Sequence, residues 1–125
     1  MIAKEIMTRD VITVKPTLAV KDLATVLIKN QISGAPVADN SGKIVGVVSE
    51  ADILAKKGKL VRAIMHANVV SVGEETPVEK IAQLMTTHKI KRLPVMSNGK
   101  VVGIVSRADI INAMALGDHV ALQTP

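Results

Sequence analysis

Two stretches of the chain place apolar residues at the spacing of an amphipathic helix. The first stripe consists of Val20, Leu23, Ala24, Leu27 and Ile28. The second consists of Val78, Ile81, Ala82 and Met85. Residues spaced i, i+3, i+4 and i+7 share one face of a helix, so both stretches are predicted to be helices with one buried side. Thr76 is the predicted N-cap of the second helix, with Pro77 at its first position and Glu79 completing a capping box.

Short aliphatic runs between these stripes predict strands. The runs cover residues 11–14, 35–38, 44–48, 69–72, 93–96 and 101–105. Asn98-Gly99 is a strong signal for a two-residue hairpin turn, and residues 39–42 are predicted to form the matching turn. Further helices are predicted near 50–57 and 107–116, and short ones near 3–7 and 60–65, with a linker at 58–62. The pattern therefore predicts a mixed fold, α/β in the broad sense and α+β in detail.

Residues 6–54 and 64–111 are two copies of one internal sequence repeat. With a single gap opposite Ser41, 19 of 48 aligned pairs are identical. The most similar stretches are 42–53 and 99–110, which read GKIVGVVSEADI and GKVVGIVSRADI. Each copy reads strand, helix, strand, strand, helix, and two such copies usually pack about a pseudo-two-fold axis. We expect domains at 1–58 and 59–117, followed by a mobile tail at 118–125.

Composition narrows the classes of function. The 125 residues include no Cys, Phe, Trp or Tyr, and the formal net charge is +5. The absence of Cys excludes disulfides and thiolate metal sites, and without aromatic rings the chain has no stacking platform for single-stranded nucleic acid. No apolar run is long enough for a transmembrane helix, so we expect a cytoplasmic protein without a membrane partner. The positive charge could attract a nucleic acid or a nucleotide, and we expect a solvated positive surface rather than a nucleic-acid interface.

Nothing in the sequence indicates catalysis or a metal site. His66, His88 and His119 share no metal-ligand spacing and are expected to be solvated. The chain also lacks a P-loop and a nucleophile-elbow motif. We therefore expect that the protein is not an enzyme and requires no cofactor.

Two Ser-x-x-Asp motifs are the candidate binding residues of the chain. Ser49-x-x-Asp52 and Ser106-x-x-Asp109 follow a glycine and two aliphatic residues at matching places of the repeat. Each motif lies where a strand gives way to a helix, so one interpretation is a capping box. A carboxylate held at such a corner could also accept two hydrogen bonds from a ribose diol, and a helix N-terminus suits a phosphate. Both interpretations stay open on the residues alone.

Together these motifs resemble a tandem pair of CBS (cystathionine-β-synthase) domains, called a Bateman module. The resemblance rests on Pro36-Val37 and Pro94-Val95 and on the two Gly-x-x-Ser-x-x-Asp motifs, and it covers nearly the whole chain. It implies two clefts that bind adenosine ligands such as AMP, ADP, ATP or S-adenosylmethionine. It also implies a regulatory module that rearranges when ligand binds, dimerises through its helices and is read by an effector protein that the sequence does not identify.

The resemblance also implies which residues surround each ligand. For the cleft with Ser106 and Asp109 the expected adenine wall is Met7, Ile12 and Ile32, and the expected phosphate-facing residues are Lys91 and Arg92. For the cleft with Ser49 and Asp52 the expected wall is Met65, Val70 and Ile90, and the phosphate-facing positions are Ser33 and Gly34. Arg107 replaces Glu50 in the second copy. We therefore predict that the Asp109 cleft is the main phosphate site, because it carries more positive charge.

Three other functions remain possible. The chain could be an interaction scaffold with degenerate nucleotide sites, which a thermal-shift assay with nucleotides would distinguish. It could be the regulatory part of an enzyme or transporter, against which the Met1 start argues mildly. A nucleic-acid binder is a more distant possibility.

Overall fold

The computed structural model describes residues 1–116, which form two compact units. Unit 1 combines Met1–Val11 with the chain from Val70 onward, and unit 2 is Ile12–Val69. The units therefore do not coincide with the sequence repeats, because the N-terminal segment packs with the second repeat. The predicted tail and His119 lie outside the described residues.

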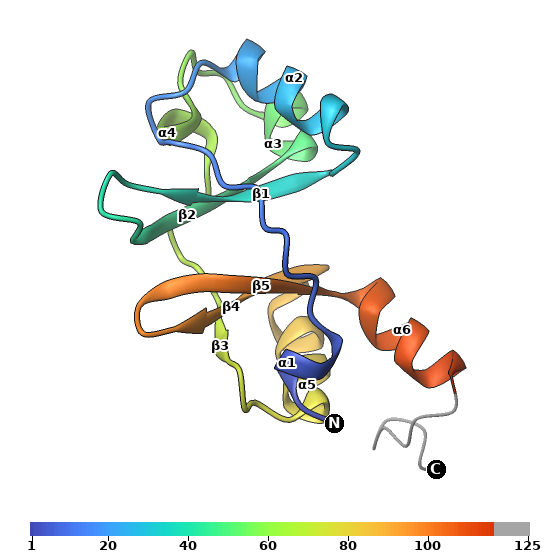
Figure 1. Ribbon diagram of the computed structural model, residues 1–125. Coiled ribbons are helices and arrows are strands. Elements are labelled where there is room, and N and C mark those ends of the chain that lie inside the picture. The colour runs from blue at the N-terminus through green and yellow to red at the C-terminus, as the bar shows by residue number, and fades with distance from the viewer. Residues whose placement is uncertain (117–125) are drawn as a thin grey trace. The chain divides into compact units, whose positions relative to one another are not determined.

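In unit 2 helices pack on one face of a two-stranded antiparallel sheet (Figure 1). The elements are α2 (Val20–Lys29), β1 (Gly34–Ala38), β2 (Ile44–Ser49), α3 (Glu50–Ala55) and α4 (Val61–Ile64). The predicted apolar stripe of α2 buries Leu23 and Leu27 against Val37, Val48 and Ile64. Burial of these aliphatic side chains supplies the main stabilisation of the unit.

The strand predicted at 11–14 is reduced to one bridge. Only Val14 pairs, in parallel with Val37, through hydrogen bonds to the backbones of Pro36 and Ala38. Residues 12 and 13 are exposed, and Pro16 follows closely. This prediction was wrong because β propensity without a neighbouring partner does not form a ladder.

Unit 1 contains a three-stranded sheet. Its elements are α1 (Ala3–Ile6), β3 (Val72–Gly73), α5 (Val78–His88), β4 (Arg92–Ser97), β5 (Lys100–Ser106) and α6 (Arg107–Ala115). Strand β4 lies between β3, with which it is parallel, and β5, with which it is antiparallel. Asn98 and Gly99 both have positive φ, which confirms the predicted hairpin turn. The strand predicted at 69–72 is limited to its last residue and Gly73.

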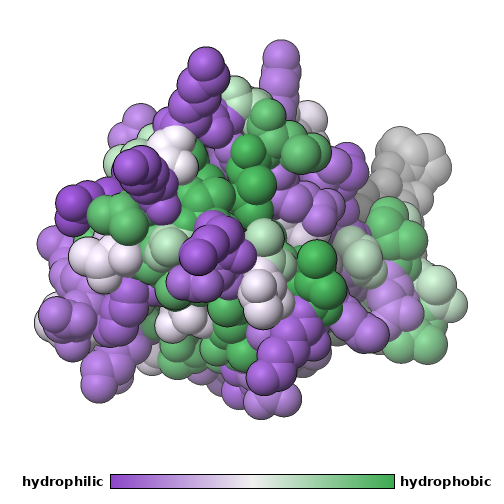
Figure 2. Space-filling view, turned by 90° about the horizontal axis from the view of Figure 1, so that it is seen from above, coloured by the Kyte–Doolittle hydropathy of each residue, from purple (hydrophilic) through white to green (hydrophobic). Residues whose placement is uncertain are grey.

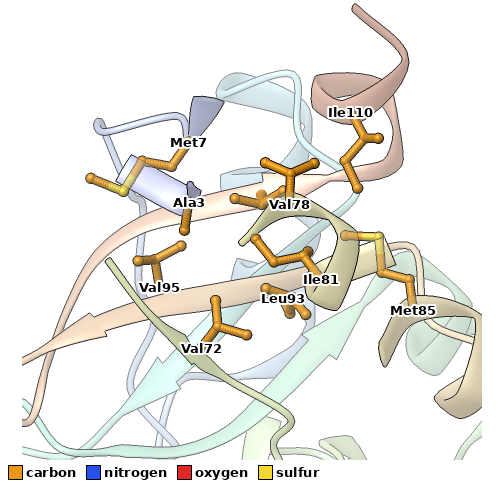
Figure 3. Close-up of a cluster of buried hydrophobic side chains, with 10 residues drawn as sticks. Ala3, Met7, Val72, Val78, Ile81, Met85, Leu93, Val95 and Ile110 are labelled. Atoms are coloured by element: carbon orange, nitrogen blue, oxygen red, sulfur yellow. The ribbon is translucent and has the colours of Figure 1, made fainter. Parts of the chain in front are cut away.

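The core of unit 1 lies between α5 and its sheet. Val78, Ile81 and Met85 project from α5 toward Leu93 and Val95 (Figure 3). The N-terminal segment contributes Ala3 and Met7 to the same cluster, and α6 contributes Ile110. Thr8 also pairs with Ile104 on the edge of β5. These contacts explain why residues 1–11 belong to unit 1.

The predicted start of α5 was wrong by one residue. Pro77 is the N-cap, and the capping box with Glu79 does not form. Instead, Thr76 Oγ1 accepts a hydrogen bond from the Gly73 N–H at 3.1 Å and closes the preceding turn. A threonine hydroxyl serves a turn as readily as a helix, and spacing alone does not separate the two.

Some apolar side chains remain outside both cores. Figure 2 shows hydrophobic residues among hydrophilic ones on one face of the molecule. The most exposed large aliphatic side chains include Ile28, Leu54, Ile111 and Leu116. Leu54 on α3 and Ile111 on α6 occupy matching positions of the repeat.

Within residues 1–116, no helix combines the length and the apolar character needed to cross a bilayer.

Candidate functional site

Each unit turns from strand to helix at its Ser-x-x-Asp motif. Ser49 is the N-cap of α3, and Ser106 is the N-cap of α6. In both places the aspartate at the third helical position accepts a hydrogen bond from the N–H of the N-cap serine. The capping interpretation is therefore confirmed as local structure. We call residues 49–52 the Asp52 corner and residues 106–109 the Asp109 corner.

A methionine packs on the glycine that precedes each corner. A methyl group on Gly46 would stand 2.7 Å from Met65 Sδ, and one on Gly103 would overlap the thioether of Met7. Met7 ends α1 and Met65 ends α4. The missing side chain lets each methionine approach the strand that leads to its serine. Two predicted wall residues, Met7 and Met65, thus lie in the same units as the Asp109 and Asp52 corners, respectively.

The Asp109 corner is half-buried and lightly bonded. Ser106 N–H donates to Asp109 Oδ2 at 2.8 Å, and Asp109 N–H donates to Ser106 Oγ at 3.1 Å. Within the described residues, the Asp109 carboxylate takes part in no ion pair, and its second oxygen has no hydrogen-bond donor. This corner therefore keeps most of its hydrogen-bonding capacity available to a ligand.

In the Asp52 corner the aspartate is buried, and each of its carboxylate oxygens has two polar neighbours. Asp52 Oδ2 accepts from Ser49 N at 2.9 Å and from Ser49 Oγ at 3.2 Å. Asp52 Oδ1 lies 3.0 Å from Lys56 Nζ and 3.0 Å from His66 Nε2. The Asp52 side chain is only 5% exposed, so these partners replace water around the carboxylate.

Opposing effects act on the pKa of Asp52. Burial is the largest and tends to raise the pKa, because it penalises the charged carboxylate. Hydrogen bonds from Lys56 and the Ser49 backbone, together with the charges of His66 and Lys56, lower it. The lowering effects prevail, and the pKa lies below its ordinary value. The carboxylate is therefore held in its charged form.

The repeat explains why the two corners differ. His66 in the first corner corresponds to Thr8 in the second, and both pair by backbone hydrogen bonds with a strand, with Val47 and Ile104, respectively. Lys56 corresponds to the buried Ala113 when the alignment is extended beyond residue 111. The motifs are the same, but in the part of the chain that the structure describes only the aspartate of the first motif pairs with a lysine and a histidine.

The predicted phosphate-facing positions lie beside the serines. Gly34 pairs with Ser49 across the β1–β2 ladder, and Arg92 pairs with Ser106 across β4–β5. The residue before each forms a matching bond. Ser33 O accepts from Glu50 N, and Lys91 O accepts from Arg107 N, both at 2.9 Å. The same backbone frame thus holds Ser33, Gly34 and Glu50 in unit 2 and holds Lys91, Arg92 and Arg107 in unit 1.

A basic pocket opens at this place in unit 1. Its volume is about 390 Å³, and it lies where the C-terminus of α5 meets the N-terminus of α6. Lys89, which ends α5 with a positive φ of 54°, joins Lys91 and Arg107 around it. Such a concentration of positive charge attracts anions. The pocket is lined by Met85, Thr86, Lys89, Ile90, Lys91 and Arg107.

The remaining predicted wall residues belong to the opposite units. Ile12 and Ile32, expected beside Asp109, are part of unit 2, and Val70 and Ile90, expected beside Asp52, are part of unit 1. Ile32 packs on the core of unit 2, whereas Val70 and Ile90 pack on that of unit 1. Their role as adenine walls stays a prediction.

Three residues near the site were not predicted from the sequence. His66 was expected to be solvated, yet its ring contacts Asp52, although the side chain is 61% exposed. The i,i+4 spacing of Asp52 and Lys56 on α3 is a recognisable ion-pair signal. Lys89 belongs to a small basic cluster in the sequence, residues 89–92, but was not predicted to lie at the phosphate site. Within residues 1–116, no cluster of His, Cys, Asp or Glu could hold a metal ion.

Comparison with known proteins identifies the family. The model of the CBS domain matches residues 3–58 and 61–116. The L-aspartate semialdehyde sulfurtransferase of Methanocaldococcus jannaschii is 34% identical over 113 residues. That match covers 87% of this chain but only 22% of the relative's length.

Two solved structures share the fold over nearly the whole chain. The CBS domain pair of protein MJ0100, in complex with 5′-methylthioadenosine and S-adenosyl-L-methionine, has a TM-score of 0.88 and 32% identity, covering 94% of this chain and 98% of that one. CBSX2 in complex with AMP has a TM-score of 0.87 and 30% identity, with the same coverages. These similarities confirm the mixed α+β fold.

Proposed function

Since the chain belongs to the CBS-domain family, we propose that it is a non-catalytic regulatory module that binds an adenosine ligand. The observation that carries the proposal is the Asp109 corner, where a half-buried carboxylate retains an oxygen without a donor among the described residues. A ribose diol supplies two hydroxyl donors at the spacing that one carboxylate accepts. Hydrogen bonds to a charged acceptor contribute about 1.5–3 kcal/mol each.

The charge around the Asp109 corner favours a phosphorylated ligand. Arg107 and Lys91 line the basic pocket next to this corner. Arginine binds phosphate through parallel hydrogen bonds, and lysine adds a point charge. The corresponding positions in unit 2 are Glu50 and Ser33, which offer no cation. AMP, ADP and ATP are therefore favoured over the cationic S-adenosylmethionine.

The similar structures support the same ligand class. One contains AMP, and the other contains two adenosine compounds. Both are at least 30% identical to this chain and cover 94% of it. The ligand class is thus proposed from relatives of the whole module, whereas the choice of AMP, ADP or ATP rests on the basic pocket.

The regulatory output is proposed to pass through a homodimer. Leu54 on α3 and Ile111 on α6 are 88% and 61% exposed at matching places of the repeat. Exposed aliphatic side chains on helices suit a partner surface. Ligand would then shift the equilibrium between two packings that an effector protein distinguishes. Light scattering should give twice the chain mass, and a Leu54→Lys, Ile111→Lys variant should give the monomer mass.

Isothermal titration with AMP tests the ligand proposal. Asp109→Ala should weaken AMP binding at least tenfold, because the ribose acceptor is lost. Asp22→Ala, which removes an exposed carboxylate of α2, is the matched control and should bind like the parent. ATP incubated with the protein should be recovered intact. Equal affinities for Asp109→Ala and the control, with both proteins folded, would disprove the ribose assignment.

A further inference from the structure

The two corners differ in how much of each carboxylate is already in use. We infer that Lys56 and His66 close the Asp52 corner, so that each chain takes one adenosine ligand, at Asp109. This inference rests on the proposed function and adds its stoichiometry and the residues that determine it. The repeat alone predicts a ribose acceptor in each copy, whereas the contacts among residues 1–116 leave only Asp109 available.

The hydrogen bonds of Asp52 account for its whole accepting capacity. An ionised carboxylate has about four lone-pair positions. Two are taken by Ser49 N and Oγ, at 2.9 and 3.2 Å. The other two face Lys56 Nζ and His66 Nε2, each at 3.0 Å. A ribose diol can reach Asp52 only by displacing these partners, whereas at Asp109 it meets an oxygen with no donor among residues 1–116.

The partners of Asp52 are themselves held in place. Besides its ion pair with Asp52, Lys56 Nζ donates a hydrogen bond to Ile64 O at 3.1 Å. The His66 backbone is fixed to Val47 by two hydrogen bonds, of 2.8 and 2.9 Å. A neutral diol that displaced Lys56 would replace an ion pair, in which both groups are charged, by hydrogen bonds from uncharged donors. The ion pair is therefore a competitor that a ribose does not displace.

The Asp109 corner shows which residues leave the aspartate accessible to a ligand. Its residues at the positions of His66 and Lys56 are Thr8 and Ala113, and neither contacts Asp109 by an ion pair or a hydrogen bond. Replacing Lys56 by alanine and His66 by threonine leaves the Ser-x-x-Asp motif and its capping hydrogen bonds intact. The double variant Lys56→Ala, His66→Thr should thus convert the closed corner into a copy of the open one.

Isothermal titration with AMP measures the outcome as molecules bound per chain. The parent protein should bind one AMP, and the Lys56→Ala, His66→Thr variant should bind two. Adding Asp109→Ala to that variant should return the value to one, now at Asp52. The matched control Lys57→Ala, His88→Thr removes an exposed lysine and an exposed histidine that do not contact Asp52, and it should bind one.

Two results would overturn the inference while leaving the proposed function standing. One is two AMP molecules per parent chain, and the other is a single AMP bound to the folded double variant. Binding of no AMP by any protein in the set would instead overturn the proposed function, and the inference with it. If the double variant unfolds, Lys56→Met, which keeps the aliphatic stem, is titrated in its place. This variant should bind a second AMP with an affinity at least tenfold lower than that of the first, and a single bound AMP would also count against the inference.

Discussion

Asp52 and Asp109 hold the same position in a repeated motif, yet they lie in opposite environments. Asp52 is buried and paired with Lys56 and His66, whereas Asp109 is half-buried and, among residues 1–116, hydrogen-bonded only to Ser106. The residues that create the difference lie outside the motif, one at the C-cap of α3 and one after α4. A motif therefore specifies the corner of the backbone, and its neighbours decide whether the corner is available to a ligand.

The glycines before the corners offer the largest test of this difference. A Cβ on Gly46 would stand 2.8 Å from His66 O, which is backbone, whereas the three atoms nearest to one on Gly103 all belong to the Met7 side chain. Gly46→Ala should cost about 3 kcal/mol of unfolding free energy and Gly103→Ala about 1 kcal/mol, since overpacking is milder where a side chain can rotate. Urea denaturation measures both. Equal losses would mean that the His66 segment yields as easily as Met7.

Removal of each aspartate should show the next largest contrast. Asp52→Ala breaks an ion pair and leaves Lys56 and His66 without their acceptor, and it should cost about 2 kcal/mol. The partial exposure of Lys56 keeps the loss below that of a fully buried pair. Asp109→Ala removes half of a capping box and should cost about 1 kcal/mol. Chemical denaturation checks the order, and a larger loss for Asp109→Ala would contradict the stabilising role of the Asp52 cluster.

The pH dependence of stability should show the smallest effect of the Asp52 environment. The pKa of Asp52 is lowered in the folded state, so an unfolded chain, with an ordinary pKa of about 3.9, takes up a proton first as the pH falls. The stabilisation is thus complete above about pH 5, decreases below about pH 4, and is lost once the pH passes the folded value. Asp52→Asn should show a weaker loss of stability between about pH 5 and pH 3. Parallel pH profiles would argue against the lowered pKa.

Much of the fold was predictable because it is written in local patterns. The stripe of α2, the turn at Asn98-Gly99 and the two strand-to-helix corners depend on neighbouring residues. The turn and the corners were confirmed, and the stripe was confirmed at Leu23 and Leu27 but was wrong at Ile28, which is 80% exposed. The start of α5 was less predictable, because Thr76 could close a turn or cap a helix. The strand at 11–14 failed because pairing needs a partner strand, and there only Val14 reaches Val37.

The candidate site likewise has features that the sequence predicted and contacts that only the structure shows. The sequence by itself determined the two copies, the serine and aspartate of each corner, and the excess of positive charge at Lys91 and Arg107, because repetition and charge are visible without coordinates. Only the tertiary structure decided that Lys56 and His66 converge on Asp52 and that Met7 packs on Gly103. His66 lies 14 positions after Asp52, and α4 and the pairing with Val47 bring it back. Long-range contacts of this kind depend on the packed chain, because no local rule of spacing connects their residues.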